Sequence, residues 1–504
     1  MKIEVSSSPP LDFPAPLLVL PLFADESLAG AAAQLSSTLN GLIAEIFEAD
    51  GFKAKVGDSR LIYNPSGASP RVLLLGLGRR DKFDAEKLRR AAAKAVSAAQ
   101  SLKKTELAFA LPVLETLSVE NAALAVAEGL ELGAHSFDDF KSDEKPAPLQ
   151  SATICVESEL ENAQRGVETA QILAAATLKC RALVNLPSNL KKPETLAQTA
   201  RDIASEKGLR VEIWDEKRIQ DEKMGALWGV GMGSEAPPRF IILEYVPEGF
   251  ENEAPIALVG KGMSFDTGGY SIKPSTSMED MKDDMAGAGV VLAAMSALAD
   301  LKIPRRVLGV IPSAENMVSD RAQRPGDIVT ARNGKTIEVL NTDAEGRLIL
   351  ADALVWTCEQ KPAAIIDFAT LTGAISIALG QEGAGLFSND DALSASLLSA
   401  GEKVGERLWR FPMWEEYREY MKGTVSDLKN IGPERRAGSI AAAIFLEEFV
   451  EKGIPWTHLD IAAVSLVKSE KFLTQRGATG FGVRMILDYL RDAEGEKGRR
   501  GEGE

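Results

Sequence analysis

The chain contains 504 residues, carries a formal net charge of −16 and is 45% hydrophobic. This length predicts two domains, and the acidic balance makes nucleic acid an unlikely partner. No apolar run reaches the roughly 18 residues that cross a bilayer, which argues against a membrane span. Three widely spaced cysteines form neither a disulfide framework nor a zinc motif, so we expect a cytoplasmic protein.

The first third of the chain, residues 1–158, is predicted to form a small α/β domain. Strand-like apolar runs at 17–20 and 71–75 alternate with alanine-rich helical stretches such as 91–102. A Gly-Leu-Gly sequence follows the second run, but Asp81 occupies the third glycine position of a dinucleotide-binding loop, so we interpret it as a turn. An oligomerisation or regulatory role is our hypothesis for this domain.

A helix over residues 159–184 is expected to link this domain to a larger one at 185–490. Five strand-like runs in the larger domain alternate with helical stretches; they lie at 240–243, 256–259, 307–311, 364–367 and 456–461. That alternation predicts a mainly parallel sheet with helices on both faces, a three-layer α/β/α domain. The fold class is therefore α/β with two domains, and residues 491–504, rich in Gly and charged residues, are expected to form a disordered tail.

Two clusters of charged residues stand out in the larger domain. In the first, Lys261 and Asp266 follow a buried-strand pattern among glycines, with Lys273 shortly after. Residues 281–285 are expected to open a helical stretch that runs to about Leu298, which would place Asp284 in its first turn, where acidic residues are favoured. Each of these residues taken singly is more typical of a solvated loop or a helix start, so the argument depends on their combination.

The second cluster, at 341–348, sets Asp343, Glu345 and Arg347 at every second position. An extended backbone would point all three side chains the same way. Two carboxylates beside a guanidinium, after a strand-like run, indicate a site that holds cations and an anion together. A solvated loop with local ion pairs is the alternative for this stretch alone.

Histidine is scarce, since only His135 and His458 occur, and this excludes a metal site built on several histidines. Oxygen ligands must dominate. The four carboxylates of the two clusters would neutralise two divalent cations, which carboxylates can bridge. Two cationic side chains would remain to attract an anion or to stabilise developing negative charge, so the residues alone predict hydrolysis. We interpret His458 as structural.

The two clusters and five further motifs, in this order and at these spacings, resemble the leucyl aminopeptidase (cytosol aminopeptidase) family of dinuclear-metal exopeptidases. The motifs lie at 185–189, 260–274, 314–317, 324–327, 341–348, 367–373 and 458–462. The resemblance covers roughly residues 160 to 490. It implies a metal-dependent aminopeptidase that releases Leu, Met and other amino-terminal residues from short peptides by attack of metal-activated water.

Position by position, the resemblance implies two divalent metal ions, with manganese favoured and zinc possible by ligand type. The tighter ion would be held by Lys261, Asp266, Asp284 and Glu345, and the exchangeable ion by Asp266, Asp343 and Glu345. Lys273 would stabilise the oxyanion, and Arg347 would anchor a bicarbonate that acts as general base. A lysine ligand must be neutral, and only adjacent cations could lower its pKa enough.

The resemblance also implies a pocket for the first side chain, lined by Met281, Thr370, Gly373, Ala462 and Ser465. Ser465 makes one edge of this pocket polar, which argues against a strict leucine preference. A homohexamer acting on short peptides is a further implication of the family. The alternatives are a dipeptidase specialised for Cys-Gly and a DNA-binding architectural protein that uses the N-terminal domain, although the acidic charge disfavours the second.

Overall fold

The computed structural model describes residues 1–26, 28–49, 51–142, 147–433, 436–471 and 473–492. The chain divides into two compact units, Met1–Ala175 with Ser469–Arg476, and Ala176–Lys468 with Gly477–Glu504. Both are α/β, which confirms the predicted fold class. Helix α15 (Val483–Arg491) includes the first residue of the tail that was predicted for 491–504. Residues 493–504 lie outside the described part of the chain.

The N-terminal unit is built on one six-stranded sheet. Its order is β1 (Lys2–Ser6), β6 (Ser151–Cys155), β5 (Glu106–Ala110), β2 (Leu18–Phe23), β4 (Arg71–Gly78) and β3 (Ser59–Tyr63). All neighbouring strands are parallel except β3 and β4.

Helices cover both faces of this sheet, because its central strand β2 is apolar at every position. Val19 of β2 packs in one hydrophobic cluster with α3 (Ala85–Ser101) and α4 (Val119–Ala134). Its neighbours Leu18 and Leu20 point the other way, into a cluster with α1 (Gly30–Thr38) and α2 (Leu42–Ala49). A strand buried on both faces therefore reads as a continuous apolar run rather than an alternating one.

The second unit is built on a nine-stranded sheet. Eight strands run in the order β16 (Leu408–Arg410), β15 (Ala384–Ser388), β18 (Trp456–Asp460), β14 (Ala364–Ala369), β9 (Ile256–Gly260), β11 (Val307–Asn316), β8 (Arg239–Tyr245) and β7 (Arg210–Trp214). The ninth, β10 (Gly262–Asp266), pairs with the far end of β11. The central strands β18, β14, β9 and β11 are parallel, and antiparallel pairs occur toward the edges.

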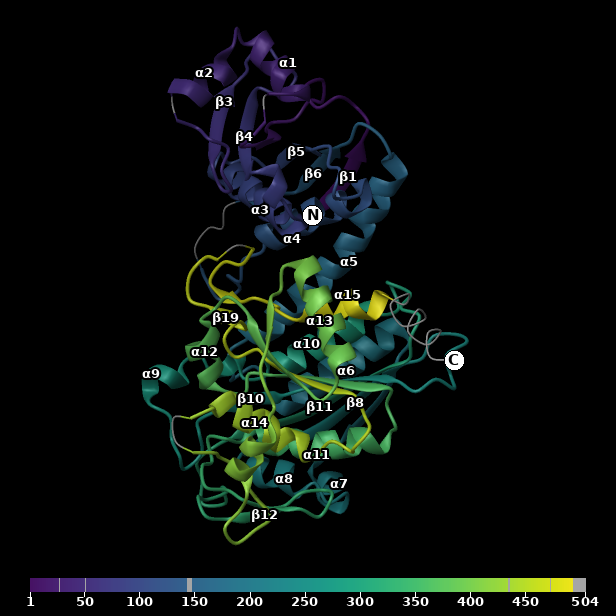
Figure 1. The fold of residues 1–504 in the computed structure, drawn as a ribbon, viewed down its shortest axis with the longest axis vertical. Coiled ribbons are helices and arrows are strands. Elements are labelled where there is room, and N and C mark those ends of the chain that lie inside the picture. Colours follow the sequence, from purple (N-terminus) through teal and green to yellow (C-terminus); the bar gives the residue numbers. More distant parts are fainter. Residues whose placement is uncertain (27, 50, 143–146, 434–435, 472, 493–504) are drawn as a thin grey trace. The chain divides into compact units, whose positions relative to one another are not determined.

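Two buried helices cover the middle of this sheet on opposite faces. On one face, α10 (Ala286–Ala297) packs against α6 (Pro193–Lys207) and α15. On the other, α11 (Gly346–Glu359) packs against α8 (Gly225–Gly231) and α14 (Gly438–Glu447). Figure 1 shows these two groups of helices on either side of β11 and β8. Every residue of α10 is buried, which explains its Ala- and Gly-rich sequence.

The remaining elements frame this three-layer unit. The long helix α5 (Leu160–Asn185) precedes it, and the other helices are α7 (Glu216–Asp221), α9 (Ser275–Met278), α12 (Gly373–Leu379) and α13 (Asp391–Val404). Small sheets are formed by β12 (Ile328–Thr330), β13 (Thr336–Glu338) and β17 (Leu428–Lys429), and by β19 (Leu466–Val467) with β20 (Gly477–Ala478). Single turns of 3-10 helix occur at Arg80–Lys82 and Met281–Asp283, and a longer one at Glu415–Met421. Among the described residues, no helix is long and apolar enough to span a membrane.

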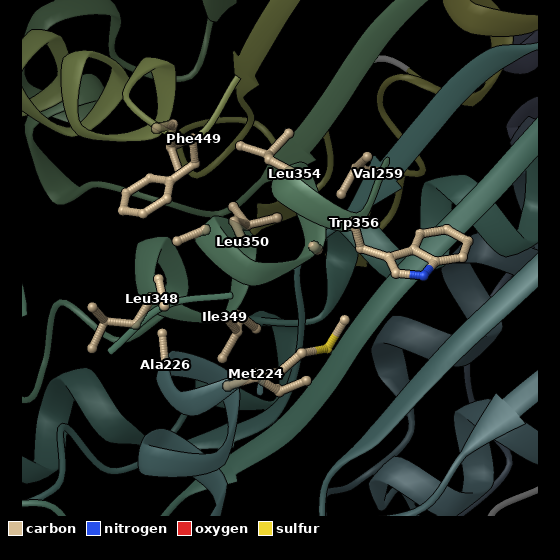
Figure 2. Packing of buried hydrophobic residues seen from close by; sticks show 14 of the residues in the cluster. Met224, Ala226, Val259, Leu348, Ile349, Leu350, Leu354, Trp356 and Phe449 are labelled. Atoms are coloured by element: carbon tan, nitrogen blue, oxygen red, sulfur yellow. The ribbon is translucent and has the colours of Figure 1, made fainter. Parts of the chain in front are cut away.

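The core on the α11 face holds this helix firmly. Figure 2 shows Leu350 and Leu354 of α11 among the buried side chains of this cluster, which also includes Met224 and Phe449. A buried polar contact adds to it, since the carboxylate of Asp352 accepts hydrogen bonds from the first backbone N–H groups of α8 at 2.9 Å. The start of α11 is thereby fixed in position.

Two local expectations from the sequence are wrong. Residues 341–348 are not extended: β13 ends at Glu338, and the Asn341 side chain accepts from the Asp343 N–H at 2.8 Å in a turn that leads into α11. Asparagine favours such turns over strand continuation. Asp284 does not lie within the first turn of a helix either, because it follows the 3-10 turn Met281–Asp283 and α10 begins at Ala286.

Candidate metal centre

The charged residues of both sequence clusters meet at the carboxyl ends of the parallel strands. Lys261 follows β9, Asp266 ends β10, and Thr370 follows β14. Glu345 immediately precedes α11. In open α/β sheets this edge is where ligands bind, because loops from several strands converge there.

Three carboxylates converge most closely. Asp266, Asp343 and Glu345 each offer an oxygen, and these oxygens all lie within 4.8 Å of one another. Asp266 and Glu345 are buried, and the Asp343 side chain is about one-third exposed. Such a group matches the ligands that divalent cations prefer.

Lys261 connects this group to Asp284. Its Nζ lies 2.7 Å from Asp284 Oδ1 and 2.9 Å from Glu345 Oε1, and it also donates to the Thr370 carbonyl at 2.9 Å. Burial alone would lower the pKa of Lys261, but the carboxylates of Asp284 and Glu345 outweigh it and raise the pKa above its usual value. The amine therefore serves as a counter-charge when no cation is present.

Lys273 forms ion pairs with the carboxylates of Asp266 and Asp343. Its Nζ lies 2.7 Å from Asp266 Oδ2 and 2.5 Å from Asp343 Oδ1. Burial opposes the charge, yet the carboxylates of Asp266, Glu345 and Asp343 raise the pKa of this lysine. Lys273 is the more exposed of the two lysines, so it can face an incoming ligand.

The cluster carries more negative charge than its lysines compensate. Burial, reinforced by the Glu345 carboxylate, raises the pKa of Asp266 to about 7. Burial also raises the pKa of Asp284 well above its usual value. Within the described part of the chain, the buried Oδ2 of Asp284 has no hydrogen-bond partner. An orphaned carboxylate oxygen beside three convergent carboxylates fits a site for cations.

Amide side chains that the sequence analysis did not single out hold the cluster together. Asn316, at the end of β11, donates to Asp266 Oδ1 at 2.7 Å and to the Thr342 carbonyl at 2.9 Å. Asn430 donates to the Asn341 carbonyl at 2.6 Å. These contacts join segments that are 26 to 89 residues apart. Asn316 lies in the motif at 314–317, but the motif does not show which residues its side chain contacts.

Arg347 lies in the first turn of α11, beside the carboxylate cluster but without an ion pair to it among the described residues. Its Nη1 donates to the Asn430 carbonyl at 2.8 Å, and its buried Nε has no hydrogen-bond partner in the described structure. Burial lowers the pKa of Arg347 to about 10, although Glu345 and Asp460 oppose this. A buried guanidinium with donors to spare is suited to hold an anion.

The residues expected to form the first side-chain pocket are connected to this cluster. Thr370 Oγ1 donates to Asp284 Oδ1 at 2.7 Å. Ser465 Oγ donates to Asp283 Oδ2 at 3.1 Å, and Asp283 closes the 3-10 turn that Met281 begins. Gly373 begins α12 and Ala462 follows β18, the neighbour of β14. Gly373 is exposed, and Met281 and Ala462 are partly exposed.

His458 lies elsewhere, within the sheet. It is fully buried, and its Nδ1 is 2.6 Å from Asp367 Oδ1, whose other oxygen accepts from the Trp456 indole at 2.7 Å. This hydrogen bond joins the neighbouring strands β18 and β14, which is consistent with a structural role for His458.

Comparison with known proteins agrees with this geometry. The catalytic-domain model of the cytosol aminopeptidase family matches residues 178–487, and the N-terminal-domain model of the same family matches residues 19–144. The chain belongs to the cytosol aminopeptidase family. It is a metal-dependent peptidase of the aminopeptidase type, as the resemblance in its motifs implied.

Relatives in this family match over nearly the whole chain. The probable cytosol aminopeptidase of Roseiflexus castenholzii is 43% identical over 98% of this chain and 99% of its own length. The probable cytosol aminopeptidase of Syntrophotalea carbinolica is 41% identical over 97% of this chain and 99% of its own length. The match therefore includes both units of the chain.

Solved structures give the same result. A mutant of tomato leucine aminopeptidase superimposes with a TM-score of 0.90 at 36% identity, covering 97% of this chain and 96% of that one. The bottromycin maturation enzyme BotP in complex with Mn gives a TM-score of 0.84 at 34% identity, covering 95% of this chain and 99% of that one. The predicted family and two-domain fold are thus confirmed.

Proposed function

We propose that this member of the family releases amino-terminal residues from short peptides with two divalent cations. The cations would be held by the residues Lys261, Asp266, Asp284, Asp343 and Glu345. The observation that carries the proposal is the convergence of three carboxylates within 4.8 Å, next to the unpartnered oxygen of Asp284. The negative surplus also suits a substrate with a positively charged amino terminus.

The ligand sets overlap at two carboxylates. Lys261, Asp266, Asp284 and Glu345 would hold the tighter cation, and Asp266, Asp343 and Glu345 the exchangeable one. Glu345 is suited to a bridging role because it is buried and remains ionised: burial would raise its pKa, but Lys261 and Lys273 lower it below its usual value. Manganese is our first choice, since oxygen ligands dominate, and zinc the second.

Bound cations of this kind lower the pKa of water and polarise a carbonyl group. The protein side chains would then position the substrate and neutralise the charge that develops on it. Lys273, whose ammonium already faces Asp266 and Asp343, would stabilise the negative charge that develops on the peptide oxygen. Arg347, with its free Nε, would hold a bicarbonate that accepts the proton.

The first side chain would enter a pocket lined by Met281, Thr370, Gly373, Ala462 and Ser465. Methionine adapts to apolar side chains of different shape, which suits leucine and methionine. We further propose a cytoplasmic location and assembly as a homohexamer, in keeping with the family. Size measurement in solution would test the assembly.

The test is hydrolysis of leucine p-nitroanilide by metal-stripped protein before and after manganese or zinc is restored. We expect activity only with metal, and none on N-acetyl-leucine p-nitroanilide, because an aminopeptidase needs a free amino group. A Glu345→Gln variant should stay inactive with metal restored. Full activity on the acetylated substrate, or in the stripped protein, would contradict the proposal.

A further inference from the structure

Asp283 is a buried carboxylate that the proposed chemistry does not use. Its exposed fraction is 9%, and its Oδ2 accepts one hydrogen bond, from Ser465 Oγ at 3.1 Å. In the described structure, no lysine or arginine nitrogen lies within 4.0 Å of it. Lys191 attracts the Asp283 carboxylate from a distance, but among the described residues no cation pairs with it directly. A buried carboxylate with one neutral donor and no direct ion pair is costly, so it calls for an explanation.

The basic side chains of the surrounding segments are engaged elsewhere. Lys191 is fully buried, and its Nζ donates to the carbonyls of Leu183, Val184 and Lys282 at 3.0, 2.9 and 2.7 Å. Lys282 Nζ donates to the Asn185 carbonyl at 3.0 Å. Backbone acceptors thus occupy both amines, and neither forms an ion pair with Asp283.

The position of Asp283 relates it to the substrate. It directly precedes Asp284, whose Oδ1 receives hydrogen bonds from Lys261 and Thr370. Its own side chain points instead to Ser465, one of the residues proposed to line the first side-chain pocket. In the proposed pocket, the Asp283–Ser465 pair would form a polar, negatively charged end.

We propose that Asp283 accepts the cationic side chain of an amino-terminal lysine or arginine, so that the protein releases basic as well as apolar first residues. This inference rests on the proposed function, because it concerns the pocket of the same site. Met281 would line the aliphatic part of such a side chain, and the ammonium or guanidinium would reach the Asp283 carboxylate. A hydrogen-bonded charge pair in a buried pocket is short and strong.

The first test compares lysine p-nitroanilide with norleucine p-nitroanilide, whose side chain is that of lysine without the ammonium group. We expect kcat/KM of the metal-loaded wild type to be higher for lysine. In Asp283→Asn, which keeps the hydrogen bond to Ser465, kcat/KM for lysine should fall at least about tenfold, while norleucine changes less than about twofold. Asp283→Glu should retain part of the lysine activity, because it retains the charge.

Asp280→Asn is the matched control. It removes one negative charge from the same segment, but Asp280 is partly exposed and pairs with Lys468 at 3.3 Å. It should leave the ratio of lysine to norleucine activity unchanged. A ratio that falls equally in both variants would overturn the proposal, because it would reflect the general field and not the pocket.

A binding measurement completes the test. Calorimetry should detect tighter binding of the product L-lysine than of L-norleucine to wild type, and this difference should vanish in Asp283→Asn. Wild type that cleaves leucine and norleucine but rejects lysine would overturn the inference and leave the proposed function intact. Failure on leucine p-nitroanilide with every metal would refute the proposed function itself.

Discussion

Both units of the molecule bury charged side chains, but they compensate them differently. In the N-terminal unit, Arg89 lies between Glu128 and Glu86 with nitrogen–oxygen distances of 2.6 Å, and Arg90 pairs with Glu86 at 2.9 Å. Two arginines thus face two glutamates across helices α3 and α4. Among the described residues, the ion pairs of this group therefore match two positive with two negative side chains.

The cluster at the carboxyl edge of the second sheet is not balanced. Its ion pairs join four carboxylates, those of Asp266, Asp284, Asp343 and Glu345, to only two lysines. Burial is the largest cause of the raised pKa values of Asp266 and Asp284, and the neighbouring Glu345 carboxylate raises both further. Buried ion pairs with equal numbers of positive and negative side chains can be satisfied within the fold. A buried group with more carboxylates than cationic side chains indicates a binding site for a positively charged ligand.

The largest expected effect is at Glu345. Replacement by Gln would remove one of the proposed ligands from both cation positions, so kcat/KM for leucine p-nitroanilide should fall at least about ten-thousandfold. The variant should remain folded, as judged by circular dichroism. Activity within about tenfold of wild type would show that the charge surplus at Glu345 has no catalytic use.

The balanced group should respond in stability rather than in activity. Arg89→Met removes the buried guanidinium that pairs with Glu128 and Glu86, and we expect a loss of about 3–5 kcal/mol in the free energy of unfolding measured with urea. Adding Glu128→Leu should restore part of that loss, because the pair is then replaced by apolar contact. A large fall in kcat of the folded Arg89→Met protein would contradict the view that the N-terminal charge group serves stability alone and the carboxylate cluster serves catalysis.

Cations should stabilise only the unit that has the surplus. Manganese at about one hundred times its dissociation constant should add about 2.7 kcal/mol of stability, seen as a rise in the unfolding temperature. The rise should be much smaller in Glu345→Gln and unchanged in Arg89→Met. An equal rise in all three proteins would indicate binding elsewhere.

Protons should compete with the cations at the cluster. The pKa of Asp266 is raised to about 7, mainly by burial, so this proposed metal ligand becomes protonated as the pH falls through 7. Lys261, with its raised pKa, must also release a proton to become a ligand. Manganese affinity should therefore weaken at lower pH, by up to about tenfold per pH unit for each proton displaced. Calorimetry at pH 6 to 8 measures this, and a flat profile would count against these ligands.

Much of the fold and the ligand types could be predicted from sequence. Strand-like runs such as 256–259 and 364–367 became central strands, because a parallel strand that is buried on both faces is mostly apolar along its length. The scarcity of histidine and the two charged motifs indicated an oxygen-rich site. The structure brings those residues together, while their roles as ligands remain proposals.

What the sequence could not predict depends on contacts between distant segments. The hydrogen bond from Asn316 to Asp266 joins residues 50 positions apart, and that from Ser465 to Asp283 joins residues 182 apart. The expected extension of 341–348 failed because the Asn341 side chain favours a turn over a strand.

The most direct test of the account is a crystal of the protein grown with manganese and measured at the manganese absorption edge. The account predicts two anomalous peaks about 3.5 to 4 Å apart, between Asp266, Asp343 and Glu345, with Asp284 and Lys261 on one of them. No peak at this cluster, or metal bound only elsewhere on the surface, would contradict it.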